Sequence, residues 1–230
     1  SYVADLIKKH GPTKFLGYDQ LEAKAKVLAI HGNDIVLDQT PFYAESGGQV
    51  ADSGTIRHCE AKPKQSNGQV KATDVIASVA KQSRVTKVKK IEGIFIHTLE
   101  STEDFNIGDE VTAQVNSKSR NLTGYHHTTC HLLQAALRQV LGNDIQQMGS
   151  QVGPEYTRFD FNLDRAMTKE EIFKTEKIVN DWIQAKLPVE TKVMDFDDAI
   201  AAGALSFFEE KYDDQVRVLF IRDDQKTASI

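Results

Sequence analysis

The sequence predicts an α+β protein in which a small N-terminal β-barrel, residues 1–116, is followed by a two-layer α/β sandwich, residues 117–230. Three observations support this prediction. Short apolar alternations separated by turn residues fill the first half, as is typical of small barrels. The apolar period changes to that of a helix at Asn121. Beyond that point strand and helix patterns alternate, which favours two packed layers.

In the first half, the strand pattern is clearest around one turn. Residues 25–30 and 34–37 are apolar stretches that flank His31-Gly32-Asn33, and Gly and Asn at such a position are typical of a β-hairpin. Residues 1–10 resemble a short helix. Further strands are expected at 70–79, 93–99 and 109–115.

The best-defined element of the second half is a helix over residues 121–141. Its apolar stripe includes Ala136, Leu137 and Val140, and Gly142 marks its end. The other predicted elements are strands at 157–162, 190–194 and 215–221, a short helix at 197–202, and a loop at 147–150.

A second long helix is predicted to begin at Thr168. A hydroxyl at the cap and Glu171 three residues later form a capping box. The predicted inner stripe of this helix comprises Ile172, Val179, Trp182 and Ile183.

The composition is that of a globular protein with no strong bias toward one partner. Apolar residues make up 40% and charged residues 27%. The 28 basic and 33 acidic residues give a net charge of −5, which excludes a general affinity for nucleic acid and leaves only local basic patches. With only two cysteines, Cys59 and Cys130, a reduced, cytoplasmic protein is expected. The longest apolar stretch, residues 199–208, is too short to span a bilayer, so no membrane partner is expected.

Two histidines at the front of the 121–141 helix are the strongest functional signal. His127 and His131 are four residues apart and therefore lie on one side of the helix, where two imidazoles can hold a transition metal such as zinc. The alternative is a pair of partly buried, hydrogen-bonded histidines. Cys130 is interpreted as a residue that lines the pocket, because three ligands from one helical turn would strain tetrahedral geometry.

A second motif, Glu45-Ser46-Gly47-Gly48-Gln49, follows the strand at 36–38. Paired glycines allow positive φ and a close approach of the backbone to a ligand. Free amide groups in such a loop can bind a carboxylate, phosphate or ribose oxygen. The alternative is an ordinary tight turn.

Two weaker signals involve basic residues. Arg158 lies on a predicted strand, where it either contacts a ligand or is salt-bridged. The densest basic run comprises Arg84, Lys87, Lys89 and Lys90. Such a run is either a solvated face or a surface that touches phosphates.

Taken together, these motifs resemble the editing region of alanyl-tRNA synthetase. The matching blocks, in order, are 42–50, 127–133, 147–150 and 158–161, extended by 203–205, 210–212 and 216–218. The resemblance runs from about Phe15 to Ile221. It implies that the second half is an editing core similar to that of threonyl-tRNA synthetase.

The resemblance also implies roles for individual residues. His127 and His131 would be the first two zinc ligands. Gln147 and Thr128 would position the attacking water or the hydroxyl of a serine. The implied substrate-binding residues are Glu45, Ser46, Gly47, Gly48, Gln49, Cys130 and Arg158.

The sequence departs from the family at the second half of the metal site. The family carries a Cys-x-x-x-His block after the strand near Val216, whereas residues 222–230 contain neither cysteine nor histidine. Zinc binding by this chain is therefore expected to be weak or absent. The aminoacylation domain with its ATP site is also not expected within these residues.

The implied activity is hydrolysis of the ester in Ser-tRNA(Ala) or Gly-tRNA(Ala), which supports alanine–tRNA ligation and the fidelity of protein biosynthesis. The alternatives are a tRNA-binding module without activity and an inactive structural fragment. The implied partners are the acceptor end of tRNA(Ala) and the other domains of the synthetase. We expect the imidazoles of His127 and His131 to face the diglycine turn across a groove between barrel and core.

Overall fold

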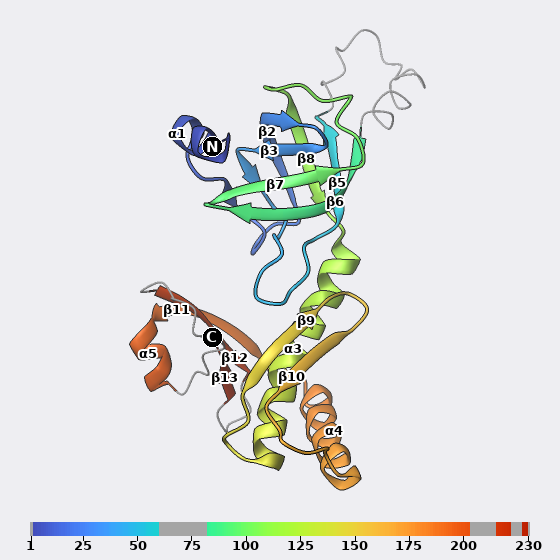
Figure 1. Ribbon diagram of the computed structural model, residues 1–230, viewed down its shortest axis with the longest axis vertical. Coiled ribbons are helices and arrows are strands. Elements are labelled where there is room, and N and C mark those ends of the chain that lie inside the picture. The colour runs from blue at the N-terminus through green and yellow to red at the C-terminus, as the bar shows by residue number, and fades with distance from the viewer. Residues whose placement is uncertain (1, 60–81, 203–214, 222–226, 230) are drawn as a thin grey trace. The chain divides into compact units, whose positions relative to one another are not determined.

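The computed structural model describes residues 2–59, 82–202, 215–221 and 227–229 (Figure 1). The chain divides into two compact units, Ser1–Gly124 with Gly153–Glu155, and Tyr125–Val152 with Tyr156–Ile230. Helix α3 (Ser117–Leu141) contributes residues to both units. The predicted domain boundary after Asn116 stays a prediction.

The first unit contains a closed barrel of six antiparallel strands, which confirms the predicted barrel. In spatial order the strands are β2 (Glu22–His31), β3 (Asp34–Leu37), β7 (Ile94–Leu99), β6 (Gln82–Ile91), β5 (Gly54–His58) and β8 (Glu110–Val115). The predicted hairpin is β2–β3, in which His31 pairs with Asp34 and Gly32 takes a φ of +58° at the turn.

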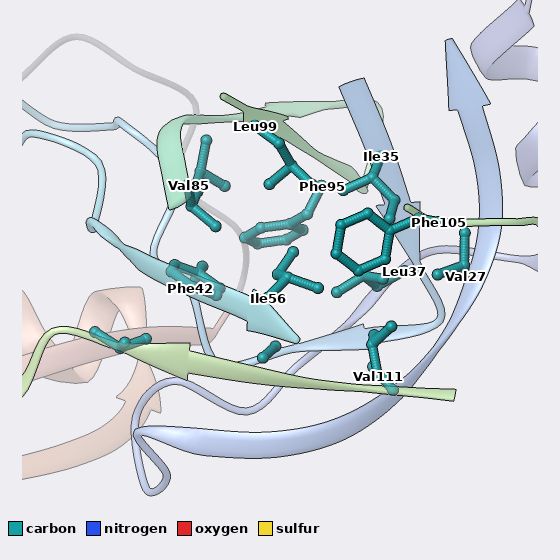
Figure 2. Packing of buried hydrophobic residues seen from close by; sticks show 14 of the residues in the cluster. Val27, Ile35, Leu37, Phe42, Ile56, Val85, Phe95, Leu99, Phe105 and Val111 are labelled. Carbon is teal, nitrogen blue, oxygen red and sulfur yellow. The ribbon is translucent and has the colours of Figure 1, made fainter. Parts of the chain in front are cut away.

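Inward-facing apolar side chains fill the barrel (Figure 2). Val27, Ile35 and Ile56 are completely buried, and burial of each such side chain contributes about 1.5–3 kcal/mol. Strand β5 can approach β8 because residue 54 is glycine. A Cβ atom on Gly54 would lie 2.1 Å from the carbonyl oxygen of Gln114.

Three short elements flank the barrel. Helix α1 (Tyr2–His10), which was predicted, packs its buried Leu6 against β2, β3 and β7. Strand β1 (Lys14–Phe15) pairs in parallel with β4 (Gln39–Thr40).

The second unit combines two small sheets with helices. Strand β9 (Gln147–Val152) pairs antiparallel with β10 (Thr157–Phe161), and β12 (Gln215–Ile221) lies between β11 (Val189–Asp195) and β13 (Thr227–Ser229). The helices of this unit are most of α3, α4 (Lys169–Gln184) and α5 (Phe196–Ala201). Within the described ranges, none of the helices of either unit is both long and apolar enough to cross a membrane.

Strand β12 packs against helices on both of its faces. Val216, Val218 and Phe220 lie on one face, as predicted, and contact α5. Leu219 and Ile221 belong to a cluster with α3 and α4 on the other face. The mixed helix and strand content agrees with the predicted α+β class.

Two predictions about local structure are wrong. Residues 147–150 were expected to form a loop but begin β9, because they pair with β10. Ile172 and Ile183, predicted on the inner stripe of α4, are 50% and 48% exposed. The buried side of α4 is set by its contacts with α3 and β12 and is centred on Thr175 and Val179.

Several predicted segments are not tested. The strand at 70–79 and the family-like blocks at 203–205 and 210–212 lie outside the described residues. Strands β5 and β6 were not predicted from the sequence.

We expect Thr168→Ala to lower the free energy of unfolding of the second unit by about 1 kcal/mol. The predicted capping box is present: Thr168 Oγ1 accepts from the Glu171 amide at 3.2 Å, and Glu171 Oε2 accepts from the Thr168 amide at 2.8 Å. Urea denaturation followed by the fluorescence of Trp182, which lies on α4, measures the loss.

The matched control is Lys177→Ala on the same helix. Lys177 forms an exposed pair with Asp181 and should contribute no more than about 0.5 kcal/mol. Equal losses for the two variants would mean that the capping box does not stabilise α4.

Candidate functional site

The predicted histidine pair lies on α3 in the second unit. The helix begins after Asn116, whose Oδ1 accepts from the Ser119 amide at 3.1 Å, and it ends before Gly142, which has a φ of +118°. The rings of His127 and His131 stack with centroids 5.0 Å apart and an interplanar angle of 21°. The spacing of four residues therefore places both imidazoles on one side of the helix.

Burial keeps both imidazoles neutral near neutral pH. It lowers the pKa of His131 to about 3, with the neighbouring His127 as the second cause. The pKa of His127 is lowered first by burial and then by the positive charge of Arg217 on β12. Neutral imidazole is the form that binds metals and accepts protons.

Cys130 lies between His127 and His131 in the sequence. It is buried, with 6% of its surface exposed. Burial raises the pKa of its thiol, and a hydrogen bond with Thr157 opposes that effect. A protonated, buried thiol is a poor nucleophile. This environment argues against Cys130 as an attacking group, and its place in the lining of a pocket stays a prediction.

The described residues supply two metal donors at this position. No group of three or more His, Cys, Asp or Glu side chains suited to a metal occurs in the described parts of the chain. Two imidazoles can supply at most two of the four ligands that a tetrahedral zinc site needs. The donor set formed by the described residues is therefore incomplete.

The other predicted residues of the second unit lie on three elements. Thr128 is half-buried on α3, next to His127. Gln147 on β9 donates from Nε2 to Ser150 Oγ at 2.9 Å. Arg158 on β10 donates from Nε to Asp160 Oδ2 at 3.1 Å, and its side chain is 60% exposed. The salt-bridged alternative for Arg158 is thus observed.

The diglycine motif of the first unit forms a tight turn. The amide of Gln49 donates to the carbonyl of Ser46 at 2.9 Å, and the amide of Ser46 donates back at 3.2 Å. Gly47 and Gly48 have φ angles of +57° and +80°, which match a type I′ turn. Both glycines are exposed, as are Glu45 and Ser46, whereas Gln49 is buried.

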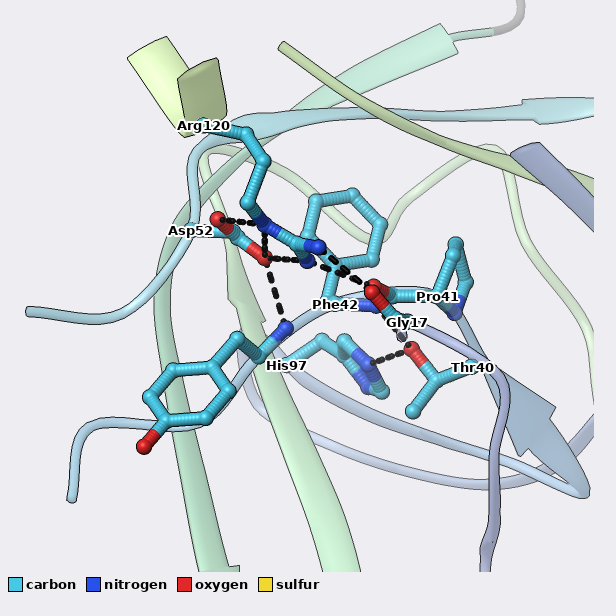
Figure 3. Close-up of polar contacts among 8 residues, drawn as sticks. Gly17, Thr40, Pro41, Phe42, Asp52, His97 and Arg120 are labelled. Atoms are coloured by element: carbon cyan, nitrogen blue, oxygen red, sulfur yellow. Dashed lines mark hydrogen bonds and ion pairs between the residues drawn. The ribbon is translucent and has the colours of Figure 1, made fainter. Parts of the chain in front are cut away.

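An ion pair that the sequence did not reveal holds the base of this turn (Figure 3). Asp52 Oδ2 accepts from the Tyr43 amide at 2.7 Å, and the Asp52 amide donates to the Tyr43 carbonyl at 3.1 Å. The guanidinium of Arg120 binds the same carboxylate through Nε, at 2.9 Å from Oδ1, and through Nη2. It also donates to the carbonyls of Gly17 and Pro41.

A separate cavity of about 500 Å³ lies in the first unit. Its lining residues are Ser53, Gly54, Thr55, Arg84, Gln114, Val115, Asn116 and Ser117. Arg84 of the basic run lines this cavity, whereas the histidine pair, the diglycine motif and the other predicted site residues do not. The expectation that the imidazoles face the diglycine turn stays a prediction.

Comparison with known proteins assigns the family. The family model described as tRNA synthetases class II (A) matches residues 5–119, half of the 230 residues. This chain belongs to the class II (A) tRNA synthetases. The match lies within the unit that carries the barrel and the diglycine turn.

The class II (A) assignment agrees with similarity to curated alanine–tRNA ligases. The chain is 39% identical to the chloroplastic/mitochondrial enzyme of Oryza sativa subsp. indica, over 94% of this chain and 22% of the relative. It is 43% identical to the enzyme of Methylobacillus flagellatus, over 91% of this chain and 23% of the relative. The enzyme of Haemophilus influenzae is 37% identical, over 95% of this chain and 24% of the relative. The chain thus spans less than a quarter of the length of these relatives.

In this class II (A) chain, sequence patterns found the histidine pair and the turn but missed Asp52, His97 and Arg120. Asp52 follows the diglycine motif closely, and Arg120 stands in the first turn of α3. A single acidic or basic residue near a motif is a common feature, and no spacing rule links positions 52 and 120. The relation between Asp52 and Arg120 is visible only in the folded structure, where the two side chains are in contact.

Proposed function

We propose that the chain is the editing region of an alanyl-tRNA synthetase and hydrolyses the ester of Ser-tRNA(Ala) or Gly-tRNA(Ala). The main support is the stacked, neutral pair His127 and His131 on one side of α3 in a chain of this family. In this proposal the second unit corresponds to an editing core similar to that of threonyl-tRNA synthetase.

The chemistry of alanine selection explains why such a site is needed. A pocket that accepts alanine cannot exclude the smaller glycine by size, and it rejects the extra hydroxyl of serine only weakly. Hydrolysis of the wrong ester at a second site corrects both errors. Alanine–tRNA ligation would then rely on this region for its fidelity.

We assign the residues roles that follow from their chemistry. His127 and His131 would supply two ligands of a zinc ion, with the remaining ligands coming from outside the described residues. A zinc ion held there supplies polarisation of the ester carbonyl or of water. Thr128 and Gln147 carry polar groups able to orient water or a serine hydroxyl. The substrate-binding residues in this proposal are Glu45, Ser46, Gly47, Gly48, Gln49, Cys130 and Arg158.

The proposed partners are the acceptor end of tRNA(Ala) and the other domains of the parent synthetase, within which ATP would bind. A cytoplasmic location belongs to the same proposal. Because the described residues offer only two zinc donors, we expect zinc binding by this chain to be weak.

We expect His131→Gln to lower the rate of serine release from Ser-tRNA(Ala) by about 100-fold or more, because the variant loses one of the two proposed zinc ligands. The matched control is His126→Gln, the same chemical change at the neighbouring position of α3. It should leave the rate within about twofold, because residue 126 is displaced by about 100° around the helix from residue 127. Single-turnover deacylation of Ser-tRNA(Ala) measures the rates of both variants. Ala-tRNA(Ala), which should not be hydrolysed, serves as the negative control.

The second candidate function is binding of tRNA without hydrolysis. The incomplete donor set favours it. Zinc content measured on the purified chain, together with the deacylation assay, separates the two. Turnover that depends on His131 supports editing, and tight tRNA binding without any turnover supports the binding module.

A further inference from the structure

We propose that the barrel end beside the diglycine turn binds the unpaired 3′ end of an RNA, with bases stacking on Tyr18 and Tyr43 and phosphates following Lys87 and Lys89 of β6. That this RNA is a tRNA rests on the proposed function. The binding surface itself is argued only from contacts within the first unit.

The first observation is a cluster of aromatic rings that reaches the surface. The ring of Phe15 stacks on buried Phe95 at 5.4 Å between centroids. Tyr18 packs edge-on against Phe15 at 5.0 Å, and Tyr43 does so at 6.3 Å. Tyr18 is nevertheless 62% exposed. The cluster is thus anchored in the barrel core and leaves a fixed ring available for stacking.

The second observation is that the diglycine turn adjoins this cluster and β6. The hydroxyl of Tyr43 donates to the carbonyl of Ser46 at 3.4 Å. The amide of Glu45 donates to the carbonyl of Val88 in β6 at 3.2 Å. A Cβ atom placed on Gly47 would meet nothing within 4 Å. Exposed backbone therefore lies between the aromatic rings and β6.

The third observation is the positive charge along β6. Lys87 and Lys89 are exposed on either side of buried Val88. Neither forms an ion pair with a carboxylate among the described residues. The ammonium of Lys90 lies 5.8 Å from the ring centroid of Phe95, so a third cation joins the aromatic cluster to the strand.

The chemistry of these groups favours a single-stranded nucleic acid. Each base has a π-face that stacks on an aromatic side chain, and local lysines neutralise phosphates even on a chain whose net charge is −5. Asp19 and Glu45 are exposed near Tyr18 and the turn. The negative charge of Asp19, the neighbour of Tyr18 in sequence, disfavours a phosphate beside that ring and leaves the ring for a base.

The experiment uses the full chain and two uncharged RNA hairpins, one with a four-nucleotide unpaired 3′ tail and one blunt, compared by fluorescence anisotropy. We expect Tyr18→Ala to weaken binding of the tailed hairpin about tenfold, the size typical of one lost base–aromatic stack. Binding of the blunt hairpin should not change. Tyr18→Phe retains the ring and should bind like the unmodified chain.

The matched control for Tyr18 is Tyr2→Ala. Tyr2 is also exposed, at 46%, but its ring lies beside His31 at the β2–β3 turn. Phe95 of the aromatic cluster lies at the start of β7, beside the β6–β7 turn. The β2–β3 turn lies near the other end of β7, because Asp34 pairs with Thr98. This variant should bind both hairpins normally.

The lysines are tested by salt dependence. Lys87→Ala/Lys89→Ala should reduce the slope of log K against log salt by about 1.4 for a single-stranded tail. The control Lys24→Ala/Lys26→Ala removes two exposed lysines from β2, three strands away around the barrel in either direction. It should leave the slope unchanged.

Equal affinity of the unmodified chain for the tailed and blunt hairpins would overturn the inference, as would tail-dependent binding that survives Tyr18→Ala. The result is separable from that of the deacylation assay. Tail binding that depends on Tyr18 without any deacylation refutes the editing function and supports this surface. Deacylation together with tail binding that does not depend on Tyr18 supports the editing function and refutes this surface.

Discussion

Arg120→Met is expected to lower the free energy of unfolding of the barrel unit by about 3–5 kcal/mol. The side chain of Asp52 is only 4% exposed, and that of Arg120 is 18% exposed. Removal of the guanidinium leaves a buried carboxylate without its cation, and it also leaves the carbonyls of Gly17 and Pro41 without their donor. Urea denaturation followed by far-UV circular dichroism measures the loss, while Trp182 fluorescence reports separately on the second unit.

The control for this prediction is Arg84→Met, which removes an arginine from an exposed pair in the same unit. Arg84 and Glu100 are 3.5 Å apart with side chains 69% and 56% exposed. Such pairs contribute at most about 1 kcal/mol, because water screens both charges. A loss for Arg120→Met no larger than that for Arg84→Met would show that the buried pair has little role in stability.

A double variant separates charge burial from lost contacts. Asp52→Asn/Arg120→Met removes the buried charge together with its partner. We expect it to be more stable than the sum of the two single losses predicts, because no unpaired carboxylate remains. Additive losses would instead mean that the two side chains act independently.

The same ion pair connects stability to the candidate site. Asp52 closes the base of the segment 43–52, which carries the diglycine turn, and Arg120 ties that base to the first turn of α3. Loosening this base should also increase the motion of Tyr43, whose amide bonds the same carboxylate. The RNA tail binding proposed above should then weaken in Arg120→Met even under conditions where the barrel stays folded.

Local sequence signals predicted much of the fold. The β2–β3 hairpin, the end of α3 at Gly142 and the capping box at Thr168 each depend on residues within a few positions of one another. Strand β6 was missed for a physical reason. A bulge between Val85 and Lys87 interrupts its alternation, so that its lysines read as a solvated charge run. The position of such a strand is set by its pairing with β5 and β7.

For the candidate site, too, the sequence predicted the contacts between near neighbours and missed those between distant residues. The spacing of His127 and His131 fixes their common side of a helix. Arg120 and Asp52 are 68 positions apart, and His97 and Thr40 are 57 positions apart. No local pattern links residues at such separations, because only the closure of the barrel brings them together.

Acidification from pH 6.5 to pH 4 is expected to destabilise the barrel unit by roughly 3 kcal/mol through His97 alone. His97 is completely buried, and burial lowers its pKa from 6.5 to about 4. Between these two pH values the unfolded chain binds a proton at this imidazole and the folded chain does not. Acid therefore favours the unfolded state, so the stabilisation is complete above pH 6.5 and is lost as the pH falls toward 4.

Burial is the reason that the folded barrel excludes that proton, and the hydrogen bond between His97 and the carbonyl of Ile35 acts in the opposite direction. Thr40 Oγ1 accepts from the amide of Phe42 at 3.1 Å and lies 2.8 Å from His97 Nε2, while His97 Nδ1 lies 3.3 Å from the carbonyl of Ile35. The carbonyl can only accept, so Nδ1 carries the hydrogen and Nε2 accepts from the Thr40 hydroxyl. A second proton would place a positive charge on this fully buried ring, away from water, which is unfavourable.

The test compares the pH dependence of His97→Gln with that of the unmodified chain. Glutamine cannot take up the proton, so the variant loses this contribution to the slope even if its stability at pH 7 is lower from altered packing. His31→Gln makes the same substitution at an exposed position of the β2–β3 turn and should retain the part of the slope that His97 supplies. Every other titrating group, including His127 and His131 in the second unit, is shared by His97→Gln and the unmodified chain, so the difference between these two curves isolates His97. Parallel curves for His97→Gln and the unmodified chain would show that His97 takes up its proton equally readily in the folded and unfolded states.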